Sequence, residues 1–168
     1  MGFNISRHMS AGLIKLDMST KLPEMAENGS RKKWILSAKE ALLTELIDVL
    51  DPADKIGNRN KLFLDFINRE KKASTGIGSG FAVPHIRSMQ AREFMVGYAR
   101  SLEGYEYDAI DGLPVNHFFI MAAPPYEDTL YLKAFKSLSE MIMFDGLSEK
   151  LMAAKEPYDV IKAIRELE

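Results

Sequence analysis

The chain has no cysteine among its 168 residues, which excludes disulfide bonds, thiolate nucleophiles and cysteine-based zinc sites. It has no apolar run near the roughly 20 residues that cross a bilayer, and no signal-peptide pattern at its start. The formal net charge is only −2, so neither a nucleic acid nor an anionic membrane surface is the expected partner. We therefore expect a soluble, cytoplasmic protein.

The composition is that of a folded domain, with 46% apolar residues and a length that buries roughly 70% of the unfolded surface. Residues 1–33 are polar and are interrupted by Pro23 and by Asn28-Gly29, which predicts an extended N-terminal arm. The first ten residues are either an expression remnant or a native frayed end, and they enter no argument about the fold. Residues 34–168 are expected to form a single domain.

Patterns typical of helices lie on both sides of patterns typical of strands. Apolar residues spaced three and four apart predict helices over 34–49, 59–71, 129–144, 147–154 and 158–167. Alternating or continuous apolar runs predict strands over 81–84, 94–99 and 115–122. This order favours an α/β (α+β) sandwich, in which a mixed β-sheet is flanked by helices.

The stretch STGIGSGFAVPH, from Ser74 to His85, is the most informative in the chain. Gly76, Gly78 and Gly80 alternate with other residues, and a backbone with so few side chains can turn several N–H groups toward one anion. The stretch ends on a histidine, whose neutral imidazole is a good nucleophile for a phosphoryl group near neutral pH. A plain helix-to-strand turn followed by a structural histidine is the alternative interpretation.

Two common nucleotide-binding patterns do not fit this stretch. A P-loop needs Gly-Lys-Ser/Thr, whereas Gly80 is followed by Phe81. The dinucleotide fingerprint needs a glycine where Phe81 stands, and it should follow a strand rather than a helix. Arg69, at the end of the preceding predicted helix, offers a guanidinium that could grip phosphate oxygens, or it is simply solvated.

Arg69-Glu70 followed by STGIGSGFAVPH resembles the active-site signature of the enzyme IIA domains of the bacterial phosphotransferase system. The resemblance is to the fructose/mannitol type, which includes stand-alone nitrogen-regulatory members. A Gly-x-Pro-Val run that continues from Gly112 to Pro124 is also similar. The likeness runs from Trp34 to the end of the chain, and it implies the fold of that family and a phosphoryl carrier that needs no metal and no other cofactor.

The resemblance also implies individual roles. His85 corresponds to the phosphorylated nucleophile, which receives its phosphoryl group from the phosphocarrier protein HPr or its nitrogen-system counterpart. The acceptor would be a IIB protein or a regulatory target. The expected phosphate surround consists of Arg69, Thr75, Gly76, Gly78, Ser79 and Gly80.

Tyr131 marks a departure from the family pattern. Many sugar-transporting relatives have a second histidine at this position, and tyrosine cannot carry a positive charge. This difference favours a regulatory carrier. A sugar-specific transport component and a binding module that is never phosphorylated are the alternatives.

His117 lies in the third predicted strand, on the same face as Val115, Phe119 and Met121. Strand alternation therefore predicts a hydrogen-bonded core histidine. A position beside His85 is the alternative.

Overall fold

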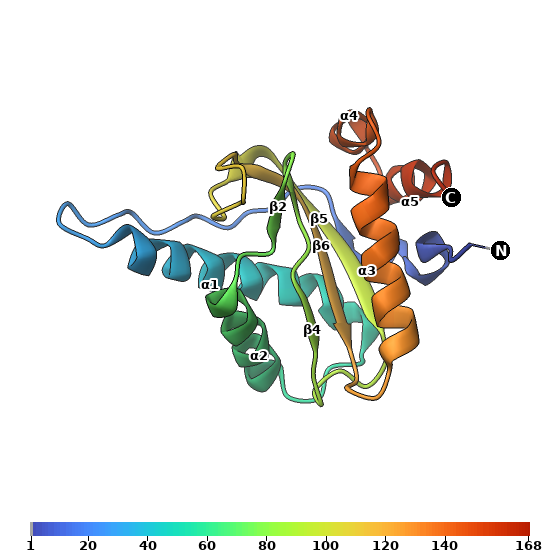
Figure 1. Cartoon of the computed structure of the whole chain (residues 1–168), viewed down its shortest axis with the longest axis horizontal. Helices are drawn as coiled ribbons and strands as arrows, with labels where there is room; N and C mark the ends of the chain where they lie inside the picture. The colour runs from blue at the N-terminus through green and yellow to red at the C-terminus, as the bar shows by residue number, and fades with distance from the viewer. Residues whose placement is uncertain (1) are drawn as a thin grey trace.

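The computed structural model describes residues 2–168. A six-stranded mixed sheet lies between two helical layers (Figure 1). Helices α1 (Arg31–Leu50) and α2 (Arg59–Lys72) cover one face, and α3 (Asp128–Ile142), α4 (Leu147–Ala153) and α5 (Pro157–Arg165) cover the other. The predicted α/β sandwich is confirmed. Within residues 2–168, none of the helices has both the length and the apolar character needed to cross a membrane.

Strand β6 (Val115–Ala123) is the centre of the sheet. It pairs antiparallel with β5 (Met95–Tyr105) on one side, and parallel with β3 (Phe81–Ala82) and β4 (His85–Arg87) on the other. The two outer strands are β1 (Ile14–Lys15), which pairs with β5, and β2 (Gly76–Gly78), which pairs with β3. Both β3 and β4 follow β6 in a single register, so they are one strand interrupted at Val83-Pro84.

The central strands are apolar on both faces because each face supports its own core. Phe118 and Ile120 point toward α1 and α2, while Phe119 and Met121 point toward α3 and the C-terminal helices. Strand alternation produces this division. It explains why the sequence of β6 reads as a continuous apolar run rather than an alternating one.

The predicted helices are all present, and their ends follow local capping. The Ser30 side chain accepts a hydrogen bond from the Lys33 N–H, so α1 begins at Arg31, three residues before its predicted start. The Asn58 side chain caps α2 in the same way, through the Lys61 N–H at 2.9 Å. The predicted start of α2 at Arg59 is therefore confirmed.

The N-terminal arm contributes more than its polar sequence predicts. Two 3₁₀ helices, η1 (Ile5–His8) and η2 (Ala11–Leu13), precede β1, and Ile5, Met9 and Leu13 are buried. The expectation of an extended arm is therefore wrong for residues 5–8 and 11–13. Its buried apolar residues recur every four positions, and Ile5 and Met9 pack in the core on the α3 side of the sheet.

Gly76 is required by a close approach of two chain segments. A Cβ at this position would lie 2.8 Å from the Cα of Ala109, and the neighbouring Ile110 N–H donates to the Gly76 carbonyl at 2.9 Å. Since backbone must move to admit a methyl group, Gly76→Ala is expected to lower the free energy of unfolding by about 1–3 kcal/mol in urea titrations. Gly12→Ala is the control, because the nearest atom lies 4.0 Å away. Equal stability of the two variants would contradict the prediction.

Candidate active site

His85 is the first residue of β4, and its half-buried ring lies between the sheet and α3. The imidazole packs against Phe135 and Tyr131, at ring-centroid distances of 4.5 and 5.9 Å. These two aromatic side chains form one wall of the site. Strand β4 itself lies beside α2 in Figure 1.

The orientation of the His85 ring is fixed by the residue two positions earlier. Its Nδ1 lies 2.6 Å from the Val83 carbonyl oxygen, and a carbonyl can only accept a hydrogen bond, so Nδ1 carries the hydrogen. The intervening Pro84 has no N–H, and its own carbonyl accepts the Met121 N–H at 2.9 Å. The ring is therefore held as the neutral tautomer whose free lone pair is on Nε2.

The environment of His85 favours that neutral form. Burial lowers the pKa of the imidazole; the Val83 carbonyl opposes this change, the Arg69 guanidinium adds to it, and the Glu70 carboxylate opposes it. The net result is a pKa below the usual value of about 6.5. At neutral pH the ring is uncharged, which is the state in which imidazole acts as a nucleophile.

Arg69 lies in the last turn of α2. Its Nη1 donates to the Ala73 carbonyl at 2.9 Å, which folds the half-buried guanidinium over the end of the helix. The same cation lowers the pKa of His85 and opposes the rise in the pKa of Tyr131, so its charge is close to both rings. The charge of Arg69 therefore acts on both His85 and Tyr131.

A second guanidinium lies beside the site. The Cζ of Arg87 is 5.3 Å from the centroid of the Tyr131 ring, and this arginine pairs with Asp128 at the start of α3. Between α2 and β4 is a cavity of about 690 Å³. Its charged lining consists of four cations and one carboxylate, namely Lys61, Arg69, Lys72, Arg87 and Asp65. Within residues 2–168, no three His, Asp or Glu side chains lie close enough together to hold a metal ion.

The glycine turn lies at the other end of the same strand. Gly78, Ser79 and Gly80 all have positive φ angles and join β2 to β3. His85 lies five residues beyond Gly80 along an extended chain, which is roughly 16 Å at about 3.3 Å per residue. The Ser79 N–H donates to the Asp111 carboxylate at 2.8 Å, so an anionic side chain already occupies this turn. The turn that contains Gly78, Ser79 and Gly80 of the expected phosphate surround therefore lies away from His85, whereas Gly76 pairs with Ala82 of β3.

Thr75 is buried beneath the site rather than open to a phosphate. Its N–H donates to Glu70 at 3.1 Å and its hydroxyl donates to the same carboxylate. Glu70 in turn forms an ion pair with Lys39 of α1. Sequence reasoning missed Lys39, although the spacing contains a signal: it lies three residues before the buried Leu42, on the apolar stripe of α1.

A family model described as "Phosphoenolpyruvate-dependent sugar phosphotransferase system, EIIA 2" matches residues 31–167. The chain belongs to this family. The match includes His85 and every helix and strand that surrounds it. The resemblance to the enzyme IIA domains is therefore confirmed for the part of the chain on which it was based.

Relatives of this enzyme IIA chain include transport and regulatory proteins. It is 31% identical over 128 residues to the fructose-specific EIIABC component of Bacillus subtilis, an alignment that covers 76% of this chain and only 20% of that protein. It is 30% identical over 156 residues to a nitrogen regulatory protein of Klebsiella oxytoca, covering 92% and 96% of the two chains. The crystal structure of the nitrogen regulatory protein IIA-Ntr of Neisseria meningitidis has a TM-score of 0.64 and 26% identity, and the match covers 95% and 98% of the two chains.

Tyr131 and His117 are two further side chains of this enzyme IIA domain for which the sequence made predictions. Tyr131 lies beside His85, where burial raises the pKa of its hydroxyl, so the phenol stays protonated at neutral pH. His117 is fully buried, with its ring nitrogens 2.6 Å from the Tyr98 hydroxyl and 2.9 Å from the Ser148 hydroxyl. The prediction of a hydrogen-bonded core histidine is confirmed.

Proposed function

We propose that this chain is a phosphoryl carrier whose His85 accepts a phosphoryl group on Nε2 from a phosphorylated HPr-type protein. It then passes the group to a IIB-type acceptor or signals by its phosphorylation state to a regulatory target. The observation that carries the proposal is the 2.6 Å contact between Nδ1 and the Val83 carbonyl, since it leaves Nε2 with a free lone pair. Membership of the phosphotransferase system family supports the class of donor.

The transfer needs little more than position and positive charge. The Nε2 lone pair forms the bond to phosphorus as the bond between phosphorus and the donor atom breaks, and the donor keeps that electron pair. His85 loses no proton, because the hydrogen on Nδ1 stays bonded to Val83. Transition states of this kind are loose, so the guanidinium of Arg69 and the cations of the neighbouring cavity would stabilise the charge on the phosphoryl oxygens.

Tyr131 supports a role in regulation more than in sugar uptake. Its hydroxyl can donate one hydrogen bond to a phosphoryl oxygen but adds no charge. Compared with a site that has a second histidine, the phosphorylated form would depend more heavily on arginine. The relatives include both fructose-specific components and nitrogen regulatory proteins. A sugar-specific transport component is therefore the alternative function.

Incubation with phosphoenolpyruvate, enzyme I and HPr is expected to label the chain with a phosphate that acid removes and base does not. His85→Ala should take no label, whereas His8→Ala, at an exposed histidine far along the chain, should label like the wild type. Equal labelling of His85→Ala would show that another residue is the nucleophile. No labelling by any general donor, with partner binding unchanged in His85→Ala, would favour the binding module instead.

A further inference from the structure

A buried ion pair lies beneath the His85 strand. Lys39 Nζ and Glu70 Oε1 are 3.0 Å apart, and the two side chains are only 4% and 1% exposed. The free energy of removing two charges from water usually exceeds the gain from their attraction. A protein in which two apolar side chains of similar volume replace the ion pair is often equally stable. Stability alone therefore does not account for these residues.

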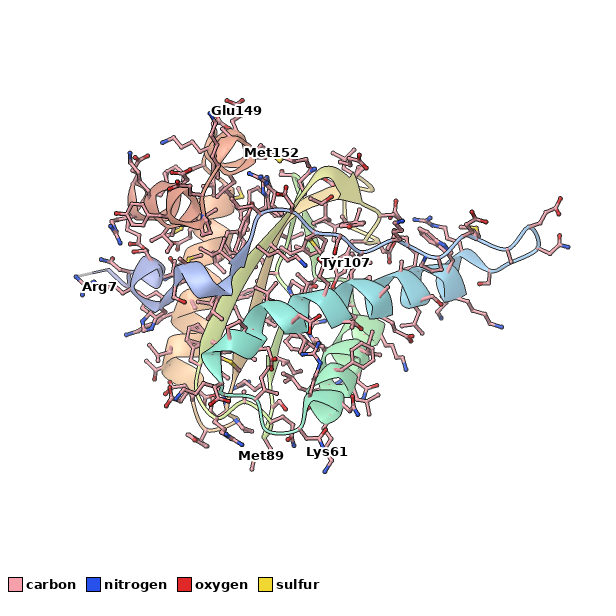
Figure 2. All side chains as sticks on the ribbon, turned by 180° about the vertical axis from the view of Figure 1, so that it is seen from behind. Arg7, Lys61, Met89, Tyr107, Glu149 and Met152 are labelled. Carbon is pink, nitrogen blue, oxygen red and sulfur yellow. The ribbon has the colours of Figure 1, made fainter. Side chains whose placement is uncertain are left out.

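The partners of Lys39 are arranged around its ammonium group. Besides Glu70 it donates to the Ser74 hydroxyl at 3.1 Å, and it lies 4.6 Å above the centroid of the Tyr107 ring. Figure 2 labels Tyr107 beside α1, the helix that carries Lys39. These contacts surround the ammonium group of Lys39 with polar and aromatic partners and hold it against the Glu70 carboxylate.

A short chain of hydrogen bonds connects this pair to the imidazole. Glu70 accepts from the Thr75 N–H at 3.1 Å and from the Thr75 hydroxyl. The Thr75 carbonyl accepts the Val83 N–H at 2.9 Å, and the Val83 carbonyl accepts the Nδ1 hydrogen of His85 at 2.6 Å. Only Thr75 and Val83 separate the buried ions from the reactive ring.

We propose that Lys39 and Glu70 are positioning residues for His85. By fixing Thr75 they hold the Val83 carbonyl where it keeps the hydrogen on Nδ1 and leaves Nε2 free for the phosphoryl group. The consequence for phosphorylation rests on the proposed function, whereas the consequence for the tautomer does not.

The charges around His85 give this proposal a pH signature. The charges of Arg69 and Glu70 act on the ring from α2, and Tyr131 packs against it from α3. Arg87 of β4 is paired with Asp128 beside Tyr131. The Glu70 carboxylate raises the pKa of His85, against burial and Arg69. Removing its charge should therefore lower that pKa and move the pH midpoint of the labelling rate to lower pH.

The test uses Glu70→Gln and Lys39→Met, with Leu50→Ala as the control. Leu50 is buried at the far end of α1, so its loss weakens the core without touching the network. Phosphoramidate is the probe, since a small donor reports the reactivity of His85 without docking of a partner protein. Both variants should label about tenfold more slowly than the wild type, and nitrogen-15 spectra of the ring should show a mixture of tautomers. Leu50→Ala should keep the wild-type tautomer and rate despite its lower stability.

Wild-type ring spectra and wild-type labelling rates in both folded variants would overturn the proposal and leave the pair with a structural role only. If either variant does not fold, Thr75→Val serves in its place, because it removes one bond to Glu70 and keeps the shape of the side chain. It should shift the tautomer mixture in the same direction by a smaller amount. If the wild type takes no label at His85, the proposed function fails, and the ring spectra still decide the positioning role.

Discussion

Arg69→Met is expected to slow phosphorylation of His85 by about 100-fold, the usual effect of removing one donor that stabilises charge in the transition state. The guanidinium is the cation that acts on the His85 ring, and no histidine stands at position 131 to share its role. Its bond to the Ala73 carbonyl makes only a small contribution to stability, about 1 kcal/mol. The loss should therefore appear in the rate of labelling and not in the fraction folded.

The pH of the assay separates charge stabilisation from a change in protonation. Arg69 lowers the pKa of His85, so its removal raises that pKa and leaves less neutral imidazole near pH 6.5. Rates measured near pH 8 compare neutral rings in both proteins. Arg59→Met, on the same helix and paired with Asp48, is the matched control and should label like the wild type. An equal rate for Arg69→Met at pH 8 would contradict a phosphate-binding role.

Acidification from pH 6.5 to pH 4 should cost about 3 kcal/mol of stability through His117 alone, because each unit of pKa difference is worth about 1.4 kcal/mol. Burial, with a smaller effect of the nearby Arg100 cation, lowers the pKa of His117 from 6.5 to about 4 in the folded chain. Between these two pH values the unfolded chain binds a proton that the folded chain does not. The free energy of unfolding therefore falls as the pH falls through this range.

Urea unfolding at a series of pH values measures this loss, and His117→Gln is the comparison. Glutamine can hydrogen-bond the Tyr98 and Ser148 hydroxyls but does not titrate. The variant should be less stable than the wild type at pH 7, and its stability should fall more gently toward pH 4. Parallel curves for the two proteins would show that folding does not lower the pKa of His117.

The fold could be predicted from the sequence where the patterns are long. Helices α2 and α3 have regular apolar spacing, and β6 is a nine-residue strand buried on both faces. The short elements could not be predicted, since β1 has two residues and β2 is made of glycine, isoleucine and glycine. A strand this short carries no periodicity, and its existence depends on the neighbour with which it pairs.

In the site, too, the features that a short motif carries could be predicted, and those that depend on segments far apart in the sequence could not. The motif predicts His85 and Arg69 as site residues, and strand alternation placed His117 in the core. The motif did not reveal that the glycine turn lies a strand's length away, because that depends on β3 and β4 running in one register along β6. Nor did it reveal the tautomer of His85 or its support by Lys39, which comes from another helix.

The docking of the arm against α5 affects the order of events during synthesis. Ile5 packs in the same cluster as Val160, Ile161 and Ile164, so its burial cannot be completed until the ribosome has made these residues. At about 5–20 residues per second, that delay is roughly 8–30 s. During this interval apolar side chains near the start of the chain are exposed, and a chaperone would bind them at this stage.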